Sequence, residues 1–91
     1  MSLLRYIPIW RRNKNGIVLY RCFEIIGGNG FTVQSADHFT TESLPTRMPE
    51  LEKQFLELLA EQSPEERFPL HPSIESAIAA FDAEFGNEYS V

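Results

Sequence analysis

The sequence predicts an α+β domain in which a three-stranded antiparallel β-meander is followed by two α-helices packed on one face of the sheet, in the order β-β-β-α-α. Two observations predict this order. Residues 3–39 are rich in β-branched and aromatic side chains and are divided by two glycine-containing turns. From residue 47 onward, apolar residues recur instead at the 3.6-residue period of a helix.

Three strands are expected within the sheet region, over residues 3–12, 17–26 and 31–39. Asn15-Gly16 separates the first two, and the segment Gly27-Gly28-Asn29-Gly30 separates the last two. Glycine, and less readily asparagine, reaches the positive φ that tight hairpin turns require. The two hairpins make a meander in which the strand over 17–26 is central. Pro8 cannot donate a ladder hydrogen bond, which suits an edge strand and fits this order.

The helices are expected over about residues 49–62 and 72–85, after a connection over residues 40–48. The first has an apolar stripe formed by Leu51, Phe55, Leu58 and Leu59. Between the helices, Ser63-Pro64-Glu65-Glu66 has the pattern of a capping box with proline at the first helical position, and it predicts a single turn. Gly86 is expected to end the second helix, and residues 87–91 are expected to fray.

Length and composition predict one domain over residues 1–91, located in the cytoplasm. A chain of 91 residues that is 43% hydrophobic and has a net charge of −5 is too apolar to be disordered. Cys22 is the single cysteine, so no internal disulfide can form and a reducing compartment is expected. No apolar run approaches the roughly 18 residues of a membrane span, so no membrane association is expected.

Side-chain alternation gives the predicted sheet two apolar faces, whereas helices packed together on one side cover only one. The core face is expected to hold Leu4, Tyr6, Trp10, Ile17, Leu19, Phe23, Ile25, Phe31, Val33 and Phe39. The second face is expected to hold Ile7, Ile9, Val18, Tyr20, Cys22 and Ile26. Because contiguous apolar patches usually mark a partner surface, we expect these six residues to form a homodimer interface. The alternative is a monomer in which the C-terminal segment covers this face.

The expected register follows from the two turns. It pairs Trp10 with Leu19 and Phe23 with Val33, and it sets Arg5 opposite Glu24 as a cross-strand ion pair.

The sequence offers few residues for chemistry. The metal-ligating types His38, His71, Asp37 and Cys22 lack the spacing of a metal site. Cys22 lies about four residues along the sheet from His38, too far for a nucleophile and base to touch. We therefore expect no catalytic activity, no metal and no other cofactor.

The charges are unevenly distributed, because residues 1–23 carry five of the eight basic residues and none of the thirteen acidic ones. Arg11, Arg12 and Lys14 form a basic hairpin tip that could contact phosphate, with Trp10, Tyr6 and Tyr20 nearby. Against this, Trp10 and Tyr6 are expected in the core, and the rest of the chain is acidic. Nucleic-acid binding is accordingly the alternative function.

The first expected function is binding of another protein. The acidic face for such a partner is formed by Glu50, Glu57, Glu61, Glu65 and Glu66. An acidic surface steers a basic partner toward it. The sequence thus predicts a small non-catalytic cytoplasmic interaction protein, of the inhibitor, immunity or antitoxin-like type or a subunit of an assembly, whose partners are itself and a second protein.

Overall fold

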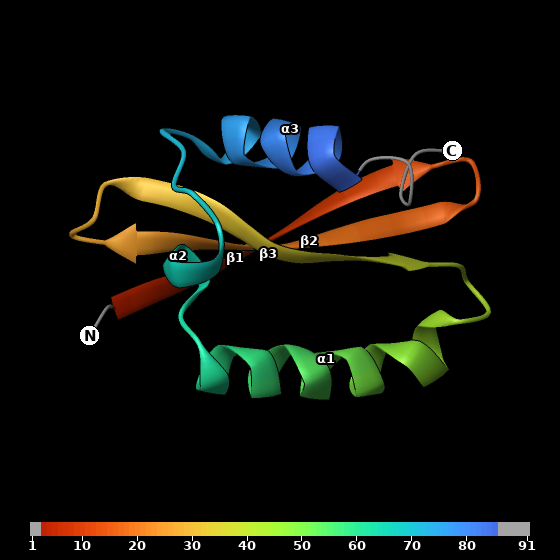
Figure 1. Ribbon diagram of the computed structural model, residues 1–91. Coiled ribbons are helices and arrows are strands. Elements are labelled where there is room, and N and C mark those ends of the chain that lie inside the picture. Colours follow the sequence, from red (N-terminus) through yellow and green to blue (C-terminus); the bar gives the residue numbers. More distant parts are fainter. Residues whose placement is uncertain (1–2, 86–91) are drawn as a thin grey trace.

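The structure, a computed structural model, describes residues 3–85. The strands β1 (Leu3–Asn13), β2 (Gly16–Ile26) and β3 (Gly30–Phe39) form one antiparallel sheet in the order β1-β2-β3. They are followed by α1 (Leu44–Glu61), the short α2 (Pro64–Arg67) and α3 (Ile74–Phe85) (Figure 1). The α+β class and the β-β-β-α-α arrangement are confirmed. None of the helices in this part of the chain is long and apolar enough to cross a membrane.

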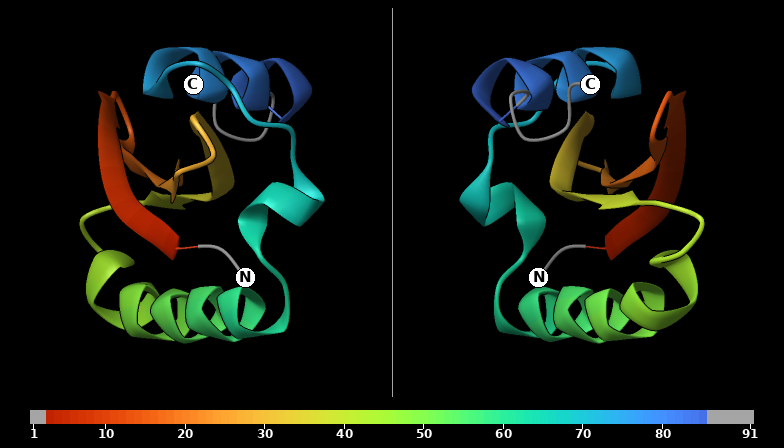
Figure 2. Two further views of the ribbon diagram at one scale, coloured as in Figure 1. Left: turned by 90° about the vertical axis from the view of Figure 1, so that its left-hand side faces the viewer. Right: turned by 90° about the vertical axis from the view of Figure 1, so that its right-hand side faces the viewer.

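The two long helices lie on opposite faces of the sheet, so the expectation that both pack on one face is wrong (Figures 1 and 2). On one face, α1 buries Phe55 against two rings of the sheet. The Phe55 ring centroid lies 5.1 Å from that of Tyr6 and 5.8 Å from that of Phe23. Aromatic pairs at such separations attract one another beyond the area that they bury. Phe55 therefore anchors α1 to the sheet.

On the other face, α3 places Ala77 and Ile78 into a buried cluster of the sheet. Its strand members are Val18, Tyr20, Cys22, Val33 and Ala36. The chain reaches this face along the β3 edge, where Phe31 and His71 exchange two backbone hydrogen bonds of 2.8 Å. Both faces of the sheet are apolar, and leaving either in water costs about 25 cal/mol per Å² of apolar area. One helix on each face removes both apolar surfaces from water.

Coverage by α3 removes the surface expected to form a sheet-to-sheet homodimer. Val18, Tyr20 and Cys22 are at most 1% exposed, and Ile7 and Ile9 pack partly buried against the same cluster. Only Ile26 of the six keeps a mostly exposed side chain. The alternative arrangement, in which the C-terminal segment covers this face within one chain, is the one that the structure has.

The register between β1 and β2 is the expected one. Trp10 pairs with Leu19, and Arg5 pairs with Glu24. The Arg5 guanidinium lies 2.6 Å from the Glu24 carboxylate, which confirms the cross-strand ion pair.

The register between β2 and β3 contains a bulge that the sequence analysis did not predict. Arg21 pairs with Ser35 and Cys22 pairs with Val33, so Gln34 is the extra residue. Phe23 consequently faces Thr32, and the expected pairing of Phe23 with Val33 is wrong. The bulge turns Val33 from the α1 side to the α3 side of the sheet, where it joins the buried cluster.

The first helix begins earlier than expected, so the connection is shorter than residues 40–48. Leu44 is its first residue, the backbone N–H of Arg47 donates to the Ser43 carbonyl at 2.8 Å, and Pro49 lies inside the helix. Pro45, at the second helical position, removes no helical hydrogen bond because the first N–H groups lack helical acceptors. Pro49 lies deeper in the helix and removes one, the bond that the Pro45 carbonyl would accept. Taking Pro49 as the start missed this extension.

The segment before α2 follows its expected pattern only in part. Pro64 does occupy the first turn, but no side chain caps the helix, because the Ser63 hydroxyl donates to the Glu65 carboxylate instead. The capping box is instead found before α3, where the N–H of Ser76 donates to the Ser73 hydroxyl and that of Ser73 to the Ser76 hydroxyl. Gly86 and residues 87–91 lie outside the described residues.

Candidate functional site

The outer side of α1 carries an acidic stripe, which we define as Glu50, Glu57 and Glu61. These positions are separated by seven and four residues, and at about 100° per residue they fall within one narrow sector of the helix. The sector lies roughly opposite Phe55, and all three side chains are exposed. The structure therefore places the three expected residues of α1 on one solvent-facing surface.

Apolar side chains flank the acidic stripe on both sides of the helix. Leu56 is 57% exposed and Leu58 is 38% exposed. By the same helical spacing, each lies between the buried side at Phe55 and the stripe. Leu58 was expected in the buried stripe, whereas the exposure of Leu56 was not anticipated. A helix with carboxylates at its crest and leucines on its flanks has the composition of a surface that a partner can cover.

The last acidic positions lie beside a shallow depression at the C-terminal end of α1, with a volume of about 370 Å³. Glu61 and Glu66 both line it, together with the apolar residues Leu4, Leu59 and Ala60. Glu65 lies apart from this lining and accepts a hydrogen bond from Ser63. The structure thus brings Glu66 to the end of the stripe, but it engages Glu65 in the turn before α2.

The position of α1 on the sheet is fixed by a buried arginine that sequence analysis did not single out. The Arg21 side chain is 0% exposed; its Nε donates to Asp37 at 3.0 Å and its Nη1 to Glu52 of α1 at 2.5 Å. The guanidinium also lies 4.8 Å from the centroid of the Phe55 ring. Burial alone would lower the pKa of Arg21, but the hydrogen bonds to Glu52 and Asp37 outweigh it and raise this pKa. Arg21 is therefore charged in the core and holds α1 in place.

One signal could have identified this arginine. Strand alternation places Arg21 on the same side of the central strand as Leu19 and Phe23, which was assigned to the core. A charge at such a position needs a partner in the fold. The acidic residue of α1 at 60° from the buried side, Glu52, is the natural candidate.

The three residues of the expected basic hairpin tip do not form one free basic surface, because the fold pairs one of them with α3. The Arg11 guanidinium lies 2.8 Å from the Asp82 carboxylate of α3 and 5.2 Å from the Tyr20 ring centroid. The Tyr20 hydroxyl donates to the same carboxylate at 2.8 Å. Burial and the neighbouring Asp82 raise the pKa of Tyr20 to about 12. Arg11 thus joins the hairpin to α3, and only Arg12 and Lys14 remain exposed at the tip without an ion pair among residues 3–85.

Trp10 and Tyr6 are more exposed than expected. Trp10 is 47% exposed and shares its side of β1 with Arg12, two residues farther along the strand. The assignment of Trp10 to the core is wrong because α1 packs over Phe23 and Tyr6, whereas the hairpin end of β1 rises away from α1 toward α3 (Figures 1 and 2). The ring therefore lies next to Arg12, which forms no ion pair within residues 3–85.

The thiol and the two imidazole groups lie at separate places on the sheet. Cys22 is fully buried, its S–H donates to the Tyr20 carbonyl, and burial raises the pKa of the thiol to about 12. His38 pairs with Val18, four positions from Cys22 along β2, and His71 bridges to Phe31 at the far end of β3. Within residues 3–85, no three His, Cys, Asp or Glu side chains are grouped so that they could hold a metal ion.

No protein-family model, no curated protein and no solved structure matches the chain.

Proposed function

We propose that this chain is a small non-catalytic cytoplasmic interaction protein that binds a basic protein through the acidic stripe of α1. The observation that carries the proposal is the alignment of Glu50, Glu57 and Glu61 on one exposed sector. Their acidic surface would raise the encounter rate with a basic partner. Such a chain would act as an inhibitor, as an immunity or antitoxin-like protein, or as a subunit of a larger assembly.

The leucines beside the stripe supply the apolar contact that charges alone lack. Surface ion pairs contribute about 0–1 kcal/mol each, so a stable complex also needs buried apolar area. Leu56 offers such area on one flank. At the end of the helix, Glu61 and Glu66 stand beside Leu4 and Leu59, which suits a lysine or arginine whose aliphatic stem packs on the leucines.

The buried contact between Arg21 and Glu52 supports the proposal through rigidity. A helix already fixed on its sheet loses little conformational freedom on binding, and the affinity is higher for that reason. Glu52 is therefore a positioning residue in this proposal, and the exposed glutamates are the contact residues.

The test is affinity capture from an extract of the source cells after nuclease treatment, with quantitative mass spectrometry. The variant Glu57→Lys/Glu61→Lys is compared with Glu42→Lys/Glu75→Lys, which changes the net charge equally at exposed positions outside the stripe. We expect one protein to be captured in stoichiometric amount by the wild type and by the control. The captured amount should fall by about tenfold or more with the stripe variant. Equal capture by both variants would reject the acidic stripe as the binding face.

The exposure of Trp10 favours a second candidate function, binding of single-stranded nucleic acid at the hairpin tip. An exposed indole next to Arg12, with Lys14 in the adjoining turn, combines base stacking with phosphate contact. In a binding assay with a labelled oligonucleotide, Arg12→Glu/Lys14→Glu should abolish binding and Trp10→Ala should weaken it. Affinity that is unchanged in both variants, or insensitive to salt in the wild type, would exclude this function.

A further inference from the structure

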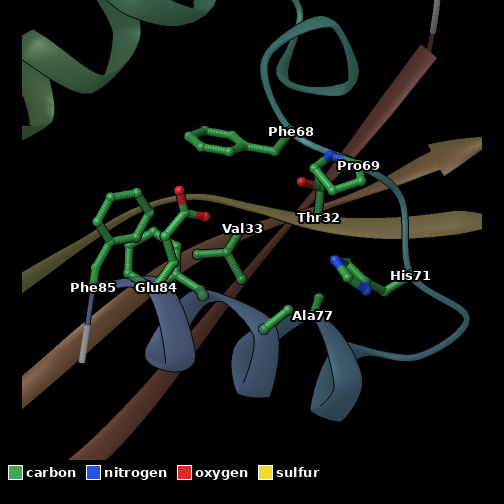
Figure 3. A pocket seen from close by; sticks show the side chains of 10 residues that line it. Thr32, Val33, Phe68, Pro69, His71, Ala77, Glu84 and Phe85 are labelled. Atoms are coloured by element: carbon green, nitrogen blue, oxygen red, sulfur yellow. The ribbon is translucent and has the colours of Figure 1, made fainter.

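The β3 edge carries a pocket that the acidic stripe does not use. Its walls come from β3, from the segment that leads into α3, and from α3 itself (Figure 3). The pocket is open to solvent on one side and has a volume of about 80 Å³. This is about half of the roughly 150 Å³ cavity that holds one benzene molecule, so the pocket can take part of a small group, with the rest of the ligand in the opening.

The pocket is held open by the local sequence. Phe31 and His71 are joined by two backbone hydrogen bonds of 2.8 Å, which bring the segment before α3 against the strand. In an antiparallel ladder the next residue whose N–H would face β3 is two positions away, at Pro69. Proline lacks an N–H, so the pairing cannot extend along β3. On the opposite wall, α3 presents Ala77 and Ala80, whose small side chains leave the space unfilled.

The polar groups at the pocket favour a cation. Figure 3 shows the Glu84 carboxylate pointing toward the space between Val33 and Phe68. No lysine or arginine is among the residues that line the pocket in the described part of the chain. Glu84 thus gives the opening a negative charge, and an anionic ligand would be repelled.

Aromatic rings strengthen this preference. Phe68, Phe81 and Phe85 line the pocket, and the ring centroids of the last two lie 4.8 Å apart. The faces of aromatic rings attract cations, and groups of rings of this kind bind methylated ammonium ions in water. Most of the remaining wall is aliphatic and suits methyl groups better than a hydrated ammonium, and the imidazole of His71 lines the pocket beside Pro69.

A buried hydroxyl without a partner also points to a ligand. Thr32 is 0% exposed, and its Oγ1 finds no hydrogen-bond partner among the described residues. Figure 3 shows this oxygen directed toward the same space below Phe68. Buried polar atoms are normally hydrogen-bonded, so a hydroxyl or carbonyl on the molecule that occupies the pocket would supply the missing partner.

We propose that this pocket binds a small methylated ammonium group, with the cation among the phenylalanine rings and facing Glu84, and a neighbouring polar atom of the ligand at the Thr32 hydroxyl. The site is independent of the proposed protein-binding face, because it lies under α3 at the β3 edge and shares no residue with α1. The same chemistry occurs in choline and in trimethyl-lysine side chains, and these two sources require separate probes.

The test is a titration of the isotope-labelled full chain followed by amide chemical shifts. The probes are choline, acetylated trimethyl-lysine amide, and 3,3-dimethylbutan-1-ol, which has the shape of choline without its charge. We expect choline or the lysine derivative to shift the amides of Val33, Ala77 and Ala80, and the neutral alcohol to bind about tenfold more weakly. The tighter of the two cations identifies the source.

Matched variants locate the site. Glu84→Gln should weaken cation binding about three- to tenfold, whereas Glu75→Gln, on the same helix but outside the pocket lining, should leave it unchanged. Ala80→Leu should fill the pocket and abolish binding. If this variant fails to fold, the comparison of Glu84→Gln with Glu75→Gln still tests whether the cation binds at the pocket. Equal affinity for choline and the neutral alcohol, or no shifts with up to about 0.1 M of either cation, would overturn the proposal.

Discussion

Arg21 and Glu52 are joined by a hydrogen bond of 2.5 Å that connects the central strand to α1. Asp37 of β3 completes the set, at 3.0 Å from the Nε of the same guanidinium. The arginine is fully buried, whereas the side chains of Glu52 and Asp37 are 40% and 18% exposed. Two partly solvated carboxylates thus neutralise one buried cation, and the Arg21 Nη2 keeps no partner among the described residues.

Removing either carboxylate should destabilise the fold by different amounts. Loss of a partner leaves a buried charge undercompensated, which costs about 3–5 kcal/mol for a fully buried pair. Because water can reach Glu52 more readily than Asp37, we expect Glu52→Gln to cost about 1–2 kcal/mol and Asp37→Asn about 2–4 kcal/mol. Urea denaturation at pH 7 measures both free energies of unfolding. The reverse order would show that Glu52 carries most of the compensation.

This arginine shows how far sequence reasoning reaches. Alternation correctly places position 21 on the side of β2 that faces the core, but the expected core face included only the apolar residues of that side. The contact with Glu52 joins residues 31 positions apart, and no local pattern encodes it. The exposure of the acidic stripe was predictable, because it follows from helical spacing alone.

The assignment of helices to sheet faces failed for a related reason. Periodicity identifies which stripe of a helix is apolar, but it does not say which of two apolar sheet faces that stripe meets. The β1–β2 register was correct because the turn that sets it is local, whereas the bulge at Gln34 depends on packing against both helices. The sheet was expected to have two apolar faces and the chain two amphipathic helices. Because each apolar face needs a cover, these two features together suggest one helix on each face.

Ile9→Glu distinguishes coverage by α3 from coverage by a second copy. Ile9 packs partly buried against the cluster that includes Tyr20 and Ile78, so a glutamate there would be desolvated within a single chain. We expect a loss of about 1–3 kcal/mol in urea denaturation with no change of mass in light scattering. A wild type that is dimeric and a variant that is a stable monomer would contradict this outcome and restore the sheet-to-sheet interface.

The fold should lose stability in alkaline solution. Burial raises the pKa of Cys22 from 9.0 to about 12, and burial together with Asp82 raises that of Tyr20 from 10.0 to about 12. For both groups the folded state favours the protonated form, so this stabilisation is complete below the unfolded pKa and disappears as pH rises through the folded one. The free energy of unfolding should therefore fall from about pH 9 to pH 12, by up to about 1.4 kcal/mol per pH unit for each group.

Two variants separate the contributions to this alkaline loss. Cys22→Ala should make the decline start near pH 10, and Tyr20→Phe should reduce its slope between pH 10 and pH 12. Chemical denaturation at a series of pH values provides the measurement, with Tyr20→Phe also expected to lower stability at pH 7 by about 1 kcal/mol through loss of its hydrogen bond. An unchanged pH profile in both variants would assign the loss to other groups, such as Tyr6, whose pKa burial also raises.

Gly30 should be intolerant of a methyl group, because it determines how closely the segment before α3 approaches β3. A Cβ built at Gly30 would lie 2.6 Å from Cβ of Leu70, closer than two carbon atoms can be without one of them moving. Gly27 provides the control, since its Cβ would meet nothing within 4 Å, although its φ of +82° is unfavourable for alanine. We expect Gly27→Ala to cost about 1 kcal/mol from its backbone angle and Gly30→Ala about 2–3 kcal/mol from the clash.

Hydrogen exchange at the Phe31 and His71 amides measures the local consequence. Gly30→Ala should accelerate the exchange of both amides, because the segment must move away from the strand, and Gly27→Ala should leave them protected. Equal exchange in the two variants would mean that a small backbone shift at Leu70 accommodates the methyl group and that the bridge does not depend on this glycine.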